Sequence, residues 1–411
     1  MSDCFGQGPA LLSVEEMLYY IKAAMPEPVS SEGVTLDQAL DRVLSETVIA
    51  GMALPRYTSS AMDGVAFALD HHQQLRLIGQ ALAGHPFKGH VGAGEGVSIT
   101  TGAPLPQGCD TVVMIEKTRQ HGNDVMLIGH ESITRGQNVR YAGEEIAPGA
   151  CVFTSGTRLG PAQLGMLASL GFETLPVYRR PKVALFSSGD ELRRSASEHD
   201  DDYTLFDANT FSLAGCLRRW GADIVSTEVL PDALEDSVER LEKAGESADL
   251  IITSGGISAG QADLVRSAIE RLGEITSWRV AMRPGKPVAF GRLANVPFFG
   301  LPGNPVAALV TLMQFVQPLL RRLGGLEKWQ AVRWRAVTEQ AIIGKIGRLD
   351  LLRGHYHVDA YGVMKVSVLQ EQGSHRLSSL YQANCLVELP ADMARCDAGT
   401  PVTIQPLGEL I

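Results

Sequence analysis

Residues that could bind a phosphate follow two short apolar runs in the middle of the chain. The run KVALF precedes residues 187–191, SSGDE, and the run DLIIT precedes residues 254–260, SGGISAG. A glycine-rich turn before a helix offers unpaired N–H groups and a partial positive charge, which together bind anions. The second turn therefore favours a phosphate site over an ordinary turn, although it matches neither G-x-G-x-x-G nor a Walker A motif. For the first turn, carboxylates that only cap a helix are an equally good interpretation.

Three basic residues lie close together downstream of these turns. Arg279, Arg283 and Lys286 occur within eight residues, around a Pro-Gly-Lys-Pro sequence. The two prolines stiffen this turn, and cations held rigidly beside a phosphate turn suit a multiply charged anion. In the next turn, LPGNP, Asn304 is a predicted helix N-cap and Pro305 the first helical residue. Together these segments predict one anion site.

The turns need strands and helices that bring them together. Residues 182–306 alternate apolar runs with amphipathic stretches, in the order KVALFSS, NTFSLAGCLRRWG, ADIVSTEVL, DALEDSVERLEKAGE, DLIITS and ADLVRSAIERLG. This alternation predicts an α/β domain whose parallel-rich sheet is covered by helices on both faces. Ligands of such sheets bind beyond the carboxyl ends of the strands, where we expect the turns to meet.

The rest of the chain predicts three further domains. The capping-box patterns SVEE and TLDQ favour N-terminal helices, so we expect a helical and linking domain at residues 1–50 and 146–180. Residues 51–145 are rich in glycine and short apolar runs, which predicts a mainly β domain with a hairpin at HGND. The α/β domain then spans residues 181–328. Alternating runs such as VMKVSVL predict a small C-terminal β-barrel at residues 329–411.

Composition is typical of a globular protein that can bury large cores. The 411 residues are 45% hydrophobic, and the net charge of −10 argues against a nucleic-acid or anionic-membrane partner. The six cysteines form no C-x-x-C pair, so neither a disulfide framework nor a zinc knuckle is expected. The stretch PVAALVTLMQFVQPLL contains two glutamines and is shorter than the roughly 20 residues that span a bilayer. We expect a buried helix, no signal peptide and a cytoplasmic protein.

Five further segments are polar and contain glycine. Each one alone is more typical of a turn than of a site. They are residues 59–64 (SSAMDG), 100–104 (TTGAP), 143–145 (GEE), 347–354 (GRLDLLRG) and 373–376 (GSHR).

Taken in order, these segments resemble a known family. The series SAMDGVA, TTGAPLP, GEE, FSSGDEL, SGGISAGQAD, RPGKPVAFG, LPGNPVAA, GRLDLLRG and GSHRLSS is similar to the successive motifs of molybdopterin molybdenumtransferases, the MoeA and gephyrin E-domain family. The resemblance covers nearly the whole chain. It implies a transferase of molybdenum-cofactor biosynthesis that takes molybdate, adenylylated molybdopterin and Mg²⁺, inserts molybdenum at the pterin dithiolene and releases AMP.

The resemblance also implies an assembly. Members of this family are elongated four-domain homodimers, in which the α/β domain of one subunit shares the active site with the GEE-bearing β domain of the other. A molybdopterin adenylyltransferase is the implied partner that delivers the substrate.

Site residues follow from the resemblance position by position. The implied catalytic residues are Asp63, Thr101, Glu145, Glu191, Asp232 and Asp263. The residues implied to bind the pterin substrate or molybdate are Ser254, Gly255, Gly256, Ser258, Gly260, Arg279, Arg283, Lys286, Pro302, Pro305, Arg353 and Ser374. The implied metal ligands are Asp190, Glu191, Asp232 and Asp263, and carboxylates are ligands that Mg²⁺ prefers.

Several positions depart from the family pattern. Arg279 and Arg283 stand where the resemblance implies lysine, and Glu145 stands where it implies aspartate. Arginine keeps the charge but is larger and forked. Ser188 replaces threonine and Val65 replaces an aromatic residue. These changes leave open whether molybdate or tungstate is the preferred anion.

Two other functions fit parts of the sequence. An adenylylating or nucleotide-cleaving enzyme could use the same α/β domain, but it would not need the ordered motifs of the β domains. A non-catalytic scaffold like the gephyrin E domain is the second alternative. The acidic and basic residues at the predicted sheet edge argue against it.

Overall fold

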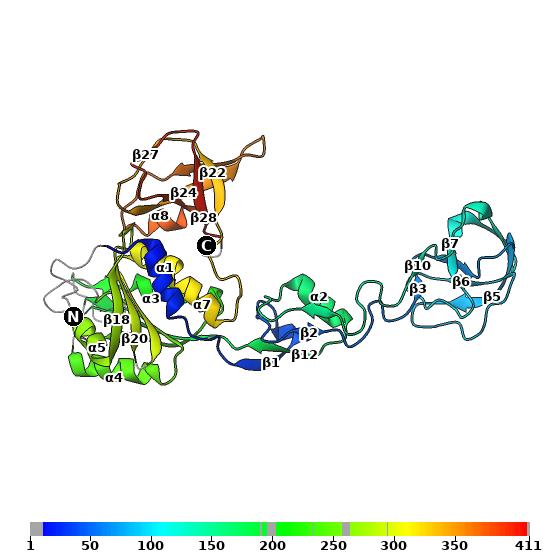
Figure 1. Ribbon diagram of the computed structural model, residues 1–411, viewed down its shortest axis with the longest axis horizontal. Helices are drawn as coiled ribbons and strands as arrows, with labels where there is room; N and C mark the ends of the chain where they lie inside the picture. The colour runs from blue at the N-terminus through cyan, green and yellow to red at the C-terminus, as the bar shows by residue number, and fades with distance from the viewer. Residues whose placement is uncertain are drawn as a thin grey trace. The chain divides into compact units, whose positions relative to one another are not determined.

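The computed structural model divides into two compact units (Figure 1). The α/β-barrel unit comprises Met1–Glu32, Asp41–Val43 and Val177–Ile411, and the β unit comprises Gly33–Leu40 and Leu44–Pro176. The structure describes residues 11–189, 191–194, 203–231, 233–256, 264–293 and 295–408. The division into four domains at the boundaries given above stays a prediction.

A six-stranded sheet forms the centre of the α/β-barrel unit. Its order is β16 (Asp223–Leu230), β13 (Lys182–Ser188), β17 (Leu250–Ser254), β21 (Val296–Leu301), β20 (Pro287–Leu293) and β18 (Gly273–Arg279). The first four strands are parallel, as predicted. Strand β20 pairs antiparallel with both β21 and β18, so the sheet is mixed. Strand β18 was not among the predicted strands, because its sequence GEITSWR has no regular alternation.

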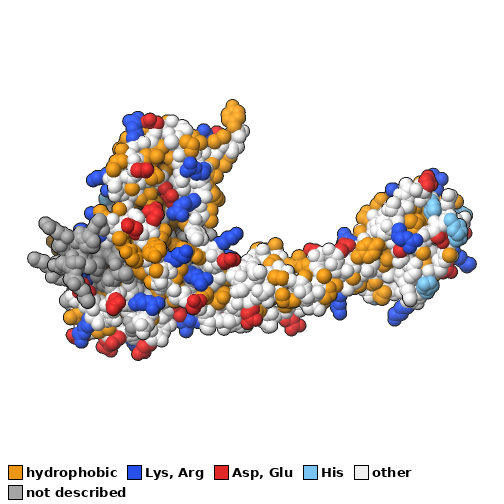
Figure 2. All heavy atoms as spheres, in the orientation of Figure 1, with side chains coloured by type: hydrophobic (Ala, Val, Ile, Leu, Met, Phe, Trp, Pro, Cys, Tyr) orange, Lys and Arg blue, Asp and Glu red, His pale blue; other side chains and the backbone are white. Residues whose placement is uncertain are grey.

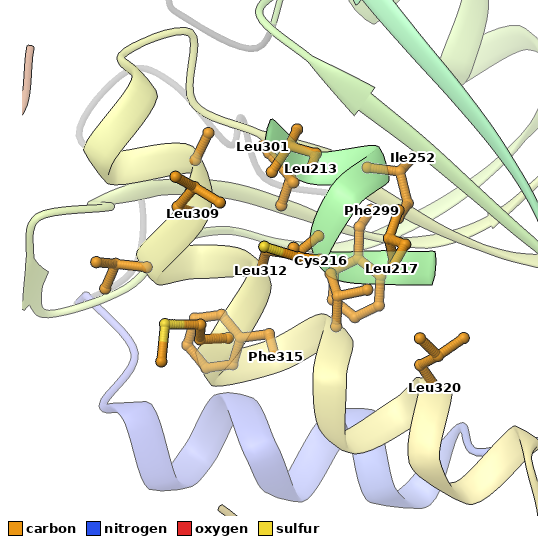
Figure 3. Packing of buried hydrophobic residues seen from close by; sticks show 14 of the residues in the cluster. Leu213, Cys216, Leu217, Ile252, Phe299, Leu301, Leu309, Leu312, Phe315 and Leu320 are labelled. Carbon is orange, nitrogen blue, oxygen red and sulfur yellow. The ribbon is translucent and has the colours of Figure 1, made fainter. Parts of the chain in front are cut away.

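Helices cover both faces of this sheet, as the uninterrupted apolar strands predict. Alternate side chains of β13 point to opposite faces: Val183 and Leu185 belong to one hydrophobic cluster, and Ala184 and Phe186 to another. The elements α1 (Val14–Ala23), α3 (Ala208–Arg219), α6 (Pro305–Thr311) and α7 (Gln317–Leu323) pack in the first cluster, and α4 (Leu234–Gly245) and α5 (Leu264–Leu272) in the second. Figure 3 shows part of the first cluster. Each fully buried Leu or Phe contributes about 1.5–3 kcal/mol.

The long apolar stretch is a buried helix, as predicted. Helices α6 and α7 are joined through a π-helical turn, Leu312–Val316, and together run from Pro305 to Leu323. This helix is long and apolar enough to cross a membrane, but 89% of its most apolar window is buried inside the protein. Gln314 donates to Gln405 Oε1 at 2.8 Å, so one of the two interrupting glutamines links the helix to the last strand of the barrel.

The C-terminal strands close into a five-stranded barrel, which confirms the predicted small β-barrel. The strands are β24 (Leu349–Val358), β25 (Met364–Val368), β22 (Trp334–Thr338), β28 (Pro401–Pro406) and β26 (Cys385–Leu389). Pairing between β24 and β26 closes the ring. A short strand, β19 (Met282–Arg283), pairs in parallel with the start of β24 and so joins the α/β layer to the barrel. Further short elements of this unit are β14 (Leu192–Arg193), β15 (Leu205–Phe206), β23 (Ile342–Ile343), β27 (Arg395–Cys396) and α8 (Ser378–Tyr381).

The β unit contains a second mixed six-stranded sheet. Its order is β7 (Thr111–Met114), β4 (Gly64–Phe67), β6 (Glu95–Ile99), β5 (Gln74–Ala81), β9 (Asp124–Leu127) and β8 (Thr118–His121). Strands β8 and β9 form the predicted hairpin, with Gly122 at φ 63° in its turn. Shorter elements are β1 (Ser31–Thr35), β12 (Thr174–Tyr178), β2 (Val48–Ile49), β11 (Cys151–Phe153), β3 (Ser59–Ser60), β10 (Val139–Arg140) and α2 (Pro161–Ser169).

One of the two predicted N-terminal helices is wrong. The capping box at the start of α1 forms, since Ser13 Oγ accepts from the Glu16 N–H at 3.0 Å and Glu16 Oε2 accepts from the Ser13 N–H at 2.6 Å. The second pattern yields only a 3₁₀ turn, Leu36–Gln38, and the side chain of Thr35 makes no capping bond. Backbone pairing explains the difference, because Leu36 donates to the Glu173 carbonyl and Leu44 to the Thr157 carbonyl.

Candidate active site

The polar turns after β13, β17 and β21 lie at the same edge of the sheet. Ser187 is in register with Ser254, and Ser254 with Leu301, at the carboxyl ends of three parallel strands. The Gly255 N–H donates to the carbonyl of Leu301 at 3.0 Å. The structure therefore brings Ser254, Gly255 and Pro302 together, as the strand-end argument predicts.

Two glycines at this edge occupy conformations that other residues would strain. Gly255 has φ 86°, and a Cβ there would lie 2.9 Å from the carbonyl oxygen of Ser188. Gly189 has φ 136°, and a Cβ there would collide with the carboxylate of Glu191. Glycine at position 255 lets the backbones of the β13 and β17 turns approach each other closely.

A buried hydrogen-bond network supports the edge. Asn209 Nδ2 donates to Ser254 Oγ at 2.8 Å and to the Gly303 carbonyl at 2.7 Å. Ser187 Oγ donates to Asp207 Oδ2 at 2.8 Å, and Asp207 also caps α3 by accepting from the Thr210 N–H. Asn209 Oδ1 is buried and has no partner among the described residues, so it is free to accept a hydrogen bond from a ligand.

A cavity of about 690 Å³ lies between the β19 turn and the barrel. Its lining contains the cations Arg283, Lys286, Lys345 and Arg348, and no aspartate or glutamate lines it among the described residues. Acidic and basic side chains are otherwise interspersed over the face of the protein in Figure 2. Among the described residues, the charged side chains of the lining are all basic, which in a chain of net charge −10 indicates an anionic ligand.

The turn that carries Lys286 is fixed by its backbone. The Val280 N–H donates to the Lys286 carbonyl at 2.9 Å, and the Arg283–Pro284 peptide bond is cis. Gly285 has φ 103°, and a Cβ there would collide with Thr311 Oγ1 and lie 2.6 Å from Met282 Cε. Only glycine fits between this turn and the long helix.

The opposite wall of the cavity carries Ser374, whose backbone carbonyl accepts from the Val306 N–H at 3.1 Å. Behind this wall lies Arg353, which is 1% exposed and does not line the cavity. Its Nε donates to Ser379 Oγ at 3.2 Å and its Nη2 to the Gly373 carbonyl at 3.2 Å. Arg353 therefore holds the loop that presents Ser374.

Arg353 is a buried cation without a carboxylate partner among the described residues. Burial, and secondly the charge of Arg283, lower the pKa of Arg353 to about 10. The guanidinium thus stays charged at neutral pH, and its positive charge adds to that of the cavity wall.

Two of the three polar segments of the β unit contact each other, through Asp63 and Thr101. Asp63 Oδ1 accepts from the Thr101 N–H at 2.6 Å and from Thr101 Oγ1 at 2.8 Å. These two bonds lower the pKa of Asp63, so its exposed carboxyl group is ionised at neutral pH. Strand β3, which precedes Asp63, pairs with β10, which precedes Glu145. Glu145 is exposed.

The chain is similar in sequence to known proteins along most of its length. Three family descriptions match successive parts of the chain: "MoeA N-terminal region (domain I and II)" at residues 12–171, "Probable molybdopterin binding domain" at 184–322 and "MoeA C-terminal region (domain IV)" at 335–407. Molybdopterin molybdenumtransferase of Haemophilus influenzae is 35% identical over 98% of this chain and 100% of its own length. The chain belongs to the molybdopterin molybdenumtransferase family. The resemblance that the ordered motifs predict is thereby confirmed.

Further relatives support the same assignment. The molybdopterin molybdenumtransferase of a Nostoc species is 32% identical over 97% of this chain and 94% of its own length. Gephyrin of Dictyostelium discoideum is 30% identical, and the match covers 92% of this chain and 60% of gephyrin. The crystal structure of a MoeA protein from Pyrococcus horikoshii superposes with a TM-score of 0.84 at 27% identity, covering 96% of this chain and all of that one.

The structure does not unite all the residues that family membership suggests. Arg279, at the end of β18, and Pro305, at the start of α6, do not line the cavity, whereas Pro302 does. Asn304 is the N-cap residue of α6, as predicted, but its side chain makes no capping bond. Asp190, Asp232, Ser258, Gly260 and Asp263 lie outside the described residues, and so does the far part of the SGGISAG turn.

The predicted metal ligands are all carboxylates, which suits the preference of Mg²⁺ for oxygen ligands. Glu191 is the described member of that set, and its carboxylate lies exposed beside Gly189. In the described part of the chain, the one group of three close metal-ligand atoms is Asp70, His71 and His72, which belongs to the β unit.

Sequence reasoning missed several residues that the geometry places at the site. Asp207 and Asn209 support the strand ends. Asp207 could have been found from the sequence, because an aspartate just before a predicted helix is a typical N-cap. Lys345, Arg348 and His375 line the cavity. They lie within or beside the segments GRLDLLRG and GSHR. The sequence around these residues does not indicate that they line the same cavity as the β19 turn.

Proposed function

We propose that this protein is a molybdopterin molybdenumtransferase that inserts molybdenum from molybdate into adenylylated molybdopterin and releases AMP. The observation that carries the proposal is the cavity of about 690 Å³, whose charged lining residues are all basic among the described residues. It belongs to a chain of which 98% matches a member of the family. Molybdate is a dianion, so electrostatic attraction favours it in this lining.

In the proposed reaction the chain mainly binds and orients its two anionic substrates. Lys286 and Arg283 attract molybdate, and the hydroxyl of Ser374 donates a hydrogen bond from the opposite wall. The N–H group of Gly256, in the turn after β17, holds a phosphate of the pterin substrate. An oxygen of molybdate or of water attacks a phosphorus of the phosphoanhydride bond, that bond breaks, and AMP leaves. The two dithiolene sulfurs bind molybdenum in place of molybdate oxygens, which leave as water with the thiol protons.

Mg²⁺, when bound, offsets charge on the departing phosphate. Asp190, Glu191, Asp232 and Asp263 would hold it.

In a homodimer, Asp63 and Glu145 would reach the same reaction from the second subunit. We also propose a cytoplasmic location and a molybdopterin adenylyltransferase as the protein that supplies the substrate.

The assay uses purified full-length protein, adenylylated molybdopterin and Mg²⁺, with and without molybdate, and follows AMP by chromatography. We expect AMP release that depends on molybdate and that falls at least tenfold in Lys286→Ala, since a charge-assisted hydrogen bond contributes roughly 1.5–3 kcal/mol. AMP release at the same rate without molybdate would instead indicate the nucleotide-cleaving alternative. No release by folded protein would favour a scaffold.

Parallel reactions with tungstate measure the anion preference. Tungstate has the same shape and charge as molybdate, so charge attraction in the basic cavity does not discriminate between them. We expect both anions to support AMP release, and a response to molybdate alone would show that the pocket selects by more than charge.

A further inference from the structure

Two basic side chains of the barrel wall have no part in the function proposed so far. Lys345 and Arg348 line the same cavity as Lys286, in the segment that leads into β24. Neither Lys345 nor Lys286 has an ion-pair or hydrogen-bond partner among the described residues. Unpaired cations that share one cavity repel each other unless an anion lies between them.

Arg348 is held in a fixed position. Its Nε donates to Asp350 Oδ1 at 3.0 Å, and the side chain of Asp350 is 3% exposed. The two terminal nitrogens of Arg348 have no partner among the described residues, so they are available to a ligand. A guanidinium anchored through one nitrogen presents the others in a rigid geometry that matches tetrahedral oxyanions.

The two walls of the cavity are joined by backbone pairing. Arg283 of β19 is in register with Asp350 of β24, and the Leu349 N–H donates to the Ala281 carbonyl at 2.9 Å. Arg348 therefore lies beside Arg283 on a connected backbone. Asp350 offsets one positive charge at this point, and no carboxylate among the described residues offsets the others that line the cavity.

A neighbouring residue shapes the same wall. His375 follows Ser374 and lines the cavity, and a Cβ on Gly373 would lie 2.9 Å from His375 Cε1. The absence of a side chain at Gly373 therefore lets the imidazole sit close to the backbone of its own loop, beside the hydroxyl proposed to bind molybdate.

We infer that Lys345 and Arg348 form a second oxyanion subsite on the barrel wall, next to Arg283 in the same cavity. The inference rests on the proposed function, because it assigns the oxyanion to one of the two anionic substrates. The ligand is a tetrahedral oxyanion, either molybdate itself or a phosphate group of the adenylylated substrate.

The test is calorimetric titration of the full-length protein at low ionic strength, with sodium molybdate in one series and AMP in another. The variants are Lys345→Ala and Arg348→Gln, and the control is Arg335→Gln, an exposed arginine of the same barrel that does not line the cavity. Lys345 has no partner among the described residues, so its removal leaves the fold intact even if Arg348→Gln disturbs Asp350.

The subsite predicts at least a tenfold loss of affinity for one of the two anions in both variants, with Arg335→Gln unchanged. Loss for molybdate identifies the metal oxyanion as the ligand, and loss for AMP identifies the nucleotide phosphate. If both variants bind both anions as the wild type does while molybdate-dependent AMP release persists, the inference is wrong and the proposed function stands. If the wild type binds neither anion and releases no AMP, both are wrong.

Discussion

Asp63 shows how one side chain at the site is prepared for its role. The backbone N–H and the hydroxyl of Thr101 both donate to its Oδ1, and together they lower the pKa of Asp63. Because this pKa is depressed in the folded state, the interaction stabilises the fold above the unfolded pKa. It is lost as the pH falls through the folded-state pKa.

The variant Thr101→Val removes the hydroxyl and keeps the N–H. We expect the pKa of Asp63 to rise toward its ordinary value without reaching it, since the backbone bond remains. Titration of the Asp63 carboxyl carbon by NMR measures this, and Thr118→Val, whose hydroxyl donates to the Ile115 carbonyl instead, is the matched control. An unchanged Asp63 pKa in Thr101→Val would show that the hydroxyl bond has no electrostatic effect.

Arg353 acts through a loop and not through the cavity surface. Its replacement by methionine leaves the Gly373 carbonyl and the Ser379 hydroxyl without their buried donor. We expect the free energy of unfolding to fall by about 1–3 kcal/mol in Arg353→Met, the usual cost of an unsatisfied buried polar group. Denaturant unfolding measures this, and Arg335→Met, at an exposed position, should change it by less than about 0.5 kcal/mol. Equal stability of the two variants would contradict the assigned role.

At the scale of single elements, the turn after β17 depends on a backbone that only glycine adopts without strain. We expect Gly255→Ala to destabilise the protein by about 1–3 kcal/mol, because φ is 86° and the new Cβ would contact Ser188. Gly215 lies inside α3 with open space around its Cα, so Gly215→Ala should stabilise by about 0.5–1 kcal/mol. Thermal unfolding of both variants checks the opposite signs, and a stabilised Gly255→Ala would contradict the turn geometry.

Local patterns predict the strand ends but not the cavity. Apolar runs that end in glycine and serine show where β13 and β17 stop, and parallel pairing then places Ser187 beside Ser254. The position of the barrel wall depends instead on pairing between β19 and β24. These strands are far apart in the chain, and neither sequence indicates that it pairs with the other. For the same reason Arg353 looked like a ligand from its motif, whereas its burial behind the Ser374 loop follows only from the three-dimensional packing.

At the scale of the whole molecule, the β unit is proposed to complete the active site of a second copy. If it does, a dimer of Lys286→Ala with Glu145→Gln contains one intact site, although each variant alone contains none. Random mixing after dissociation should restore about a quarter of the wild-type AMP release, as expected for a two-fold assembly. Mixing two variants of the same wall, Lys286→Ala and Arg283→Ala, should restore none. Equal recovery in both mixtures, or in neither, would contradict a shared site.

The most direct test of the account is the stoichiometry of the reaction. Purified protein would turn over adenylylated molybdopterin with Mg²⁺ and molybdate, and the AMP released and the molybdenum bound to the pterin product would be measured in the same samples. We expect the two quantities to rise together, about one to one, because loss of the nucleotide and insertion of the metal belong to one event in the basic cavity. AMP that accumulates while the pterin stays free of molybdenum would contradict it.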